Sequence, residues 1–376
     1  MTPADAPAAG NLYVHVPFCR RKCAYCALRS RAGVPPPERA DYVAHIVRAV
    51  RDCRAAGLLS APLGTVYFGG GSPALCDLGP VLAELAPLLA DMTEFTVELH
   101  PLDADGETLR RLRDGGVNRI SMGVQSLDDA TLAQMGRGYA SGDAERAFAR
   151  IRSRFDNAGI DLIVGYPSPR AAGGADAEST FRGRLERLRN WGLRHCSVYA
   201  LILEEGSALA HRLRTGAEDG TLLPSDDETM DRIRAVARFL AEIGLERYEI
   251  SNYAAPGFAC RHNLATWRGE DYVGLGEGAH GRMGRMRTQN WFGPGLPAGF
   301  GPLPPAVETV PAGSDRKERA LFRLRTRDGL DATGWPEWER PLAKYREEGL
   351  LTESGGIHRL TDRGMEVCDS ILADLV

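Results

Sequence analysis

Short apolar runs alternate along the chain with longer segments of helical periodicity. Six of the runs are rich in β-branched or aromatic residues and predict strands at residues 11–17, 64–70, 94–101, 118–126, 159–167 and 195–203. Amphipathic segments such as residues 38–57 and 177–192 lie between them and end in the glycine that commonly follows a helix. Strands that alternate with helices in this way predict a parallel sheet joined by crossover helices, and therefore an α/β fold.

Six strand–helix units are fewer than the eight that close a full barrel, so the pattern predicts an incomplete (β/α)6 barrel, open on one side. The chain of 376 residues exceeds the ~250–300 residues of a single core, so smaller parts should flank the barrel. A Pro/Gly-rich stretch and, after it, helix, hairpin and helix signals predict a linker and a winged-helix-like domain. The expected division is a tail (1–10), the partial barrel (11–215), a central region (216–292), the linker (293–314) and the winged-helix-like domain (315–376).

Composition narrows the function classes. The chain is 43% hydrophobic and 26% charged with a net charge of −4, which is ordinary for a globular protein and gives no electrostatic argument for nucleic-acid binding. No stretch approaches the ~18 apolar residues of a membrane span, and the first residues do not resemble a signal peptide. We therefore expect a cytoplasmic protein without an integral membrane segment, whose eight cysteines are reduced thiols.

Three of these cysteines, Cys19, Cys23 and Cys26, stand in the run PFCRRKCAYCALRS after the first predicted strand. Thiolates at this spacing can bind one iron–sulfur cluster and leave one iron without a protein ligand, free to bind a substrate or cofactor. A structural zinc site is the alternative, but zinc prefers four ligands and no second Cys or His pair follows at a suitable distance. The other five cysteines are scattered singly, which is typical of small buried side chains.

Polar residues and glycines collect where predicted parallel strands end, at the edge where such folds place reactive groups. They are Gly69, Gly70, Gly71, Glu98 and Gln125, with Asp161 within the fifth strand before a Gly-Tyr-Pro turn and Arg137 after the fourth strand. Each has a structural alternative. The glycines could form only a tight turn, the polar residues could be satisfied by partners in a core, and Arg137 on its own is typical of a solvated helix residue.

The cysteine run, the strand-end glycines and GVQS resemble the radical S-adenosylmethionine superfamily, with Tyr25 as the aromatic residue before the last cysteine. The resemblance implies a 4Fe–4S cluster held by Cys19, Cys23 and Cys26, whose open iron chelates S-adenosylmethionine and cleaves it to a 5′-deoxyadenosyl radical. It also implies an S-adenosylmethionine pocket lined by the following residues: Tyr13, Tyr25, Gly69, Gly70, Gly71, Glu98, Gln125, Arg137 and Asp161.

Further motifs, including YVHVPFC, NRISMGVQS, CRHNLATW and GLGEGAHG, resemble the oxygen-independent coproporphyrinogen III oxidase-like family from about residue 11 to the C-terminus. The dehydrogenase of that family carries another cysteine where this chain has Leu28, and it has a longer N-terminal extension. Both departures favour the HemW subgroup of heme chaperones. His100, where Asn is usual, is a further departure and could alter contacts near the S-adenosylmethionine ribose.

The segment CRHNLATW resembles the HNxxYW motif of that subgroup, with His262 and Trp267 matching and Thr266 in place of the usual Tyr. The resemblance implies heme contact by His262 and Trp267. The structural alternative is that His262 caps a turn and Trp267 packs in a small core. Imidazole is a common ligand of heme iron, so the functional interpretation is chemically reasonable.

The sequence supports three functions as hypotheses, of which one is a binding role and one is enzymatic. The favoured one is a HemW-like heme chaperone that binds the cluster, S-adenosylmethionine and heme as cargo, with heme-acceptor proteins and an electron donor as partners. This hypothesis also allows peripheral contact with membrane-bound acceptor proteins. The alternatives are a radical enzyme, either a porphyrinogen dehydrogenase or a methyltransferase, and an interaction module that is merely stabilised by metal.

Overall fold

The computed structural model describes residues 7–167, 181–217, 223–293 and 304–376. Its centre is a sheet of six consecutive parallel strands, and these are the six that the sequence predicts. They are β1 (Asn11–Val16), β4 (Thr65–Gly70), β5 (Glu94–Leu99), β6 (Arg119–Gln125), β7 (Asn157–Val164) and β8 (His195–Ala200). The predicted α/β class with an incomplete barrel is confirmed, because the strands at the two ends of the sheet do not pair with each other.

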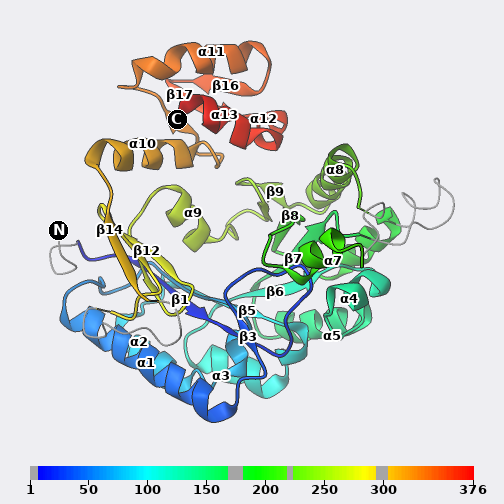
Figure 1. Ribbon diagram of the computed structural model, residues 1–376, viewed down its shortest axis with the longest axis vertical. Helices are drawn as coiled ribbons and strands as arrows, with labels where there is room; N and C mark the ends of the chain where they lie inside the picture. Colours follow the sequence, from blue (N-terminus) through cyan, green and yellow to red (C-terminus); the bar gives the residue numbers. More distant parts are fainter. Residues whose placement is uncertain (1–6, 168–180, 218–222, 294–303) are drawn as a thin grey trace.

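Both edges of the sheet extend beyond the six predicted strands (Figure 1). Beside β1 lies a seventh parallel strand, followed by an antiparallel run, and beside β8 lie two short antiparallel strands. The added strands are β11 (Tyr272–Leu275), β12 (His280–Met283), β13 (Met286–Gln289), β14 (Ala306–Thr309), β10 (Asn252–Ala254) and β9 (Glu246–Arg247). Strand β14 falls within the predicted linker, of which residues 294–303 lie outside the described residues.

Helices pack against the outer face of the sheet (Figure 1). The helices that follow β1 to β8 are α1 (Pro36–Ala55), α2 (Gly79–Leu85), α3 (Gly106–Asp114), α4 (Asp129–Met135), α5 (Ser141–Arg152), α7 (Ala208–Arg214) and α8 (Asp226–Glu242). The predicted helix at 38–57 is α1, and Gly57 beyond its end has φ +70°, a conformation that glycine adopts at little cost. Of the predicted segment 177–192, residues 177–180 lie outside the described part of the chain.

Side chains alternate in character along the barrel strands. In β5, Phe95 and Val97 are fully buried in the main hydrophobic core. Glu94, Thr96 and Glu98 alternate with them and so lie on the other face of the sheet. The other parallel strands repeat the pattern, and we call their polar side the inner face. The apolar side packs on the helices, whereas the inner face carries groups that can meet a ligand.

The C-terminal segment has its own hydrophobic core, built around Trp338, Leu342 and Ile371. It contains α10 (Ala312–Arg323), β15 (Leu330–Asp331), α11 (Glu339–Glu347), β16 (Leu351–Ser354), β17 (Ile357–Leu360), α12 (Asp362–Glu366) and α13 (Cys368–Leu375). Four helices around a small antiparallel sheet of order β15–β17–β16 match the predicted winged-helix-like arrangement. The domain boundaries stay predictions.

Candidate cluster and cofactor site

The cysteine run forms one loop after β1, fastened at both ends. Cys19 ends the short strand β2 (Phe18–Cys19), which pairs with β3 (Arg31–Ala32) at the far end of the loop. In between, Ala24 accepts a hydrogen bond from the Leu209 amide (2.7 Å) and donates one to the Met135 carbonyl (3.0 Å). The loop is therefore held between α4 and α7 at the C-terminal end of the barrel.

All three thiols of this loop are free and half-buried. Burial raises the pKa of Cys19 and of Cys26. At Cys23 a guanidinium contacts the thiol, because Arg137 Nη1 donates to Cys23 Sγ over 3.3 Å. Within the loop, Lys22 Nζ donates to the Leu28 carbonyl over 2.6 Å and so places its ammonium group beside the backbone of the segment that carries the thiols.

In the described ranges, no three Cys, His, Asp or Glu side chains are close enough to share a single metal ion. A 4Fe–4S cluster does not need that arrangement, because each thiolate binds a different iron and the sulfurs lie farther apart. Three partly exposed thiols on one loop, with a guanidinium beside one of them, therefore fit a cluster and do not fit a mononuclear zinc site.

Gly70 and Gly71 pack too closely for any side chain, and a Cβ on Gly69 would be tight against Glu98 at 3.0 Å. A Cβ on Gly71 would lie 2.4 Å from the Phe18 carbonyl oxygen, and one on Gly70 would lie 2.6 Å from the His15 ring. Gly70 also has φ +106°, which only glycine adopts readily. The structural role is thus real at all three positions, and it brings backbone N–H groups to the edge of the barrel beside the cysteine loop.

Two carboxylates, Glu98 and Asp161, lie near each other on the inner face. Tyr67 donates to Glu98 Oε1 (2.8 Å), the Gly70 amide donates to Oε2 (3.1 Å), and Ser121 Oγ donates to Asp161 Oδ1 (3.1 Å). Burial and then the neighbouring Asp161 raise the pKa of Glu98 to about 7, and burial also raises the pKa of Asp161. Both side chains are half-buried, so solvent reaches them. A pair of this kind suits a cationic ligand.

Arg137 is buried at 8% exposure, so the interpretation as a solvated helix residue is wrong. It follows the left-handed Gly136 that ends α4, and its Nη2 donates to the Gly123 carbonyl over 2.6 Å. Gln125 lies two residues after Gly123 on β6, where the pairing of β6 with β7 is irregular, and it has φ +68°. A non-glycine residue held in that region is strained, and such strain is concentrated at functional sites.

The two tyrosines of the predicted pocket come from different elements, Tyr13 from β1 and Tyr25 from the cysteine loop. Tyr13 on β1 is bonded to His15 Nδ1 over 3.0 Å, and burial with the nearby Glu98 raises its pKa. Tyr25 packs edge-on against Tyr166 at 6.5 Å between ring centres. Eight of the nine residues of the predicted S-adenosylmethionine pocket come from the cysteine loop, the inner face or the C-terminal ends of strands, and Arg137 comes from the end of α4.

His262 lies elsewhere, at the opposite ends of the strands. It stands on α9 (Arg261–Trp267), whose first amides donate to the Glu94 carboxylate at the start of β5. The ring is 6% exposed, and its Nδ1 lies 2.7 Å from Thr65 Oγ1. Because the Thr65 hydroxyl donates to Asn11, Nδ1 carries a proton and Nε2 keeps its lone pair.

Burial lowers the pKa of His262 to about 3, so the ring is neutral. Tyr67 lies 5.1 Å away between ring centres and Tyr13 lies 6.3 Å away. The imidazole has the chemistry of an iron ligand, but it is enclosed by aromatic rings beneath the cofactor site.

Trp267 joins α9 to the C-terminal segment. Its Nε1 donates to Glu249 Oε2 over 2.9 Å, its ring meets Phe322 of α10 edge-on, and the Arg325 guanidinium lies over it. The side chain is half-buried. This is the packing role given above as the structural alternative, while heme contact stays a prediction.

Sequence reasoning missed most of the inner-face polar residues. Besides Glu94 and Thr65, the structure adds Arg119, which is 1% exposed and whose Nε has no hydrogen-bond partner among the described residues. It also adds His195, bonded to Tyr248 over 2.8 Å. The signal that could have found them is the period of two, since polar residues alternate with apolar ones in these strands.

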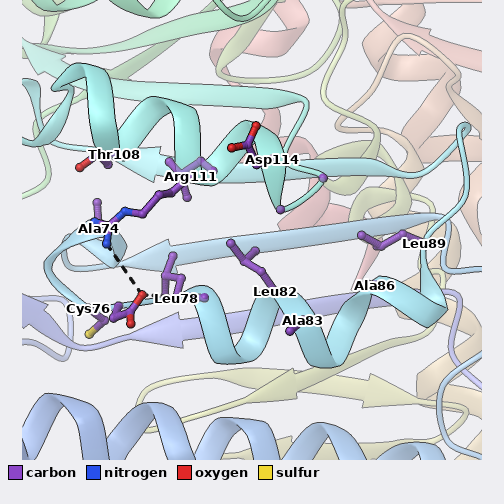
Figure 2. A pocket seen from close by; sticks show the side chains of 15 residues that line it. Ala74, Cys76, Leu78, Leu82, Ala83, Ala86, Leu89, Thr108, Arg111 and Asp114 are labelled. Atoms are coloured by element: carbon purple, nitrogen blue, oxygen red, sulfur yellow. Dashed lines mark hydrogen bonds and ion pairs between the residues drawn. The ribbon is translucent and has the colours of Figure 1, made fainter.

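A groove of about 500 Å³ lies apart from this site, on the outer side of the barrel between α2 and α3 (Figure 2). Its walls are mainly apolar, with Leu78, Leu82 and Leu112 among the lining residues, and Arg111 and Asp77 face each other at 4.0 Å. None of the predicted site residues lines it.

Comparison with known proteins agrees with this geometry. The model of the Radical SAM superfamily matches residues 13–169, which span the cysteine loop and the strand ends described above. The matched segment contains the cysteine loop and the first five parallel strands of the sheet, the first of them from Tyr13 onward.

Relatives narrow the class. The heme chaperone HemW of Mycobacterium tuberculosis is 32% identical over 100% of this chain and 97% of its own length. HemW of Escherichia coli is 33% identical over 73% of this chain and 70% of its length. The mitochondrial radical S-adenosyl methionine domain-containing protein 1 of Mus musculus is 32% identical over 95% of this chain and 76% of its length. This chain belongs to the HemW family.

A solved structure supports the fold over nearly the whole chain. Coproporphyrinogen III oxidase (HemN) from Escherichia coli, described as a radical SAM enzyme, superposes with a TM-score of 0.78 at 18% sequence identity. The match covers 99% of this chain and 90% of that one. Within the described residues, no helix is both long and apolar enough to cross a membrane.

Proposed function

We propose that this chain is a heme chaperone that binds a 4Fe–4S cluster and S-adenosylmethionine, takes up heme as cargo and transfers it to acceptor proteins. The observation that carries the proposal is the cysteine loop, in which three free thiols lie with the Arg137 guanidinium at the barrel end. The full-length relatives named heme chaperones supply the cargo.

Cys19, Cys23 and Cys26 would hold the cluster. When bound, the cluster would supply one electron to S-adenosylmethionine, and a reductant partner would have to supply that electron. The chain's own contribution is to bind and orient. Glu98 and Asp161 provide negative charge for the cationic cofactor, and the glycine edge lets it approach the backbone.

Arg137 would bind an anionic group of the cofactor or the cluster thiolates, since it is the guanidinium buried at this end of the barrel. Gln125, Tyr13 and Tyr25 would complete the walls. The described thiols are all free, which suits a reducing compartment, so we propose a cytoplasmic location.

One observation favours a second candidate, a radical enzyme that acts on a porphyrinogen. The fold matches HemN, a radical SAM enzyme by its description, over nearly the whole chain. Leu28, which is 57% exposed on the cysteine loop, argues against it because the dehydrogenase pattern has a cysteine there.

Anaerobic cluster reconstitution followed by three parallel assays separates the two candidates. The first assay follows heme binding by Soret absorbance. The second measures the amount of coproporphyrinogen that remains, and the third measures the release of 5′-deoxyadenosine as the product of radical chemistry. Stoichiometric heme uptake without porphyrinogen turnover supports the chaperone. Turnover of coproporphyrinogen, or no heme uptake at all, refutes it.

The cluster assignment has its own test. Cys23→Ala should abolish the absorbance near ~400 nm that thiolate-bound iron–sulfur centres give. Cys368→Ala is the matched control, because Cys368 is buried in the separate core of the C-terminal segment and should leave the iron content unchanged. Retention of the full absorbance in Cys23→Ala would remove Cys23 from the ligand set.

A further inference from the structure

His280 lies on the inner face at the cofactor end of the sheet. It begins β12, which runs antiparallel to β11, and β11 in turn runs parallel to β1. Tyr272 pairs with Arg282 and Tyr13 pairs with Gly274. Paired residues share a face and alternate residues return to it, so His280 is on the same face as Tyr13.

The loop between β11 and β12 packs directly on the cysteine loop. Arg29 Nε donates to Glu277 Oε1 over 2.7 Å, and this glutamate is almost completely buried. A Cβ on Gly278 would lie 2.9 Å from Arg29 Cβ and 3.1 Å from His15 Nε2, so the two loops touch there. These contacts fix the start of β12 next to the proposed cluster.

Exposure sets His280 apart from most other histidines. Of the eight in the chain, His280 and His211 are exposed, whereas the remaining six are half-buried or buried. No hydrogen bond to the His280 ring is found among the described residues. His262, in contrast, is enclosed and bonded to Thr65. An exposed, unbonded imidazole can reach a large planar ligand without any change in the fold.

An apolar side chain is exposed on the adjoining loop. Leu28 precedes Arg29, the residue on which the β11–β12 loop packs, and is 57% exposed. Large apolar side chains left in solvent are notable when they border a functional site. An imidazole with an apolar neighbour suits a macrocycle that has a metal centre and apolar faces.

We propose that His280 is the residue that binds the iron of heme, at the cofactor end of the barrel beside the cysteine loop. The inference rests on the proposed heme-binding function and specifies its site. Heme would then sit within reach of the loop that holds the cluster, and His262 would act as a structural residue that fixes α9 to the barrel.

The test titrates ferric heme into the reconstituted full-length protein and into His280→Ala, His262→Ala and His211→Ala, and follows the Soret band. We expect His280→Ala to bind at least tenfold more weakly and to lose the absorption spectrum of an imidazole-ligated heme. Added imidazole should restore that spectrum. His211→Ala, an exposed histidine on α7, should bind as the unmodified protein does.

Each outcome decides a separate question. If the unmodified protein binds no heme, the proposed function itself fails. If it binds heme and His280→Ala has the same affinity and spectrum, the proposed function stands and the His280 site is wrong. Loss of binding only in His262→Ala, with unchanged thermal unfolding, assigns the ligand to α9 instead.

Weaker binding in His280→Ala without recovery of the spectrum by imidazole also contradicts ligation. Iron content and thermal unfolding are measured for each variant. His280→Gln, which keeps a polar side chain at this exposed position, should reproduce the loss if the imidazole itself is required.

Discussion

A methyl group on Gly71 should disturb the cysteine loop more than any change of similar size on the surface. The new Cβ would lie 2.8 Å from the Phe18 carbonyl carbon and 2.4 Å from its oxygen. Non-bonded carbon atoms pack best at about 3.5–4.0 Å, so the two segments would have to separate by about 0.7–1.2 Å. Phe18 directly precedes Cys19, so the movement passes straight to a proposed cluster ligand.

Overpacking of this kind costs about 1–3 kcal/mol. The same displacement stretches the hydrogen bond from the Ser72 amide to the Phe18 carbonyl, which is 2.6 Å long. Such a bond contributes about 0.5–1.5 kcal/mol to stability. Because binding sites need their groups within about 0.5 Å of the productive geometry, the cluster should suffer before the fold does.

Gly71→Ala should therefore lower the free energy of unfolding by at least about 1 kcal/mol and reduce iron and sulfide per chain after anaerobic reconstitution. Gly313→Ala is the control, since a Cβ there meets no atom within 4 Å on α10. Full iron content and unchanged unfolding in Gly71→Ala would show that the cysteine loop does not depend on this contact.

Three further predictions concern charge and hydrogen bonding. S-adenosylmethionine should bind more weakly as the pH falls through 7, because the pKa of Glu98 is about 7 and protonation removes the negative charge that attracts the cation. In Glu98→Gln, the part of the pH dependence that is centred near pH 7 should disappear. Calorimetric titration of S-adenosylmethionine at several pH values measures both effects. Arg137→Gln should speed the loss of iron to a chelator, since it removes the hydrogen bond to Cys23. A hydrogen bond from a charged group is worth about 1.5–3 kcal/mol. Equal rates of iron loss in the variant and the unmodified protein would contradict that role. Trp267→Phe should lower the free energy of unfolding by about 1–3 kcal/mol, because the buried Glu249 carboxylate loses a hydrogen-bond donor. An unchanged free energy of unfolding in denaturant would contradict this prediction.

The fold was largely predictable because its strands are locally distinct. Each parallel strand is a short β-branched or aromatic run between glycines and polar turns, and six such runs are enough to indicate a barrel with a gap. The added strands β9 to β14 were missed because they are only two to four residues long, too short for a continuous apolar run to mark them.

Site residues could be predicted from the sequence only where they belong to a recognisable motif. The cysteine spacing and the family resemblance named the residues, but neither could say that Arg137 is buried or that Glu98 and Asp161 share one environment. Those facts depend on which strands become neighbours, and residues far apart in sequence meet only after the sheet has formed.

Two histidines show most clearly which properties of the site cannot be predicted from the sequence. The sequence by itself determined the cysteine loop, the six strands and the family, because local spacing and periodicity carry that information. Only the tertiary structure decided that His262 is enclosed against Thr65 while His280 stands exposed beside the cysteine loop. Burial is a property of the folded chain, since it depends on the pairing of β11 with β1 and on the packing of α9, which no local pattern specifies.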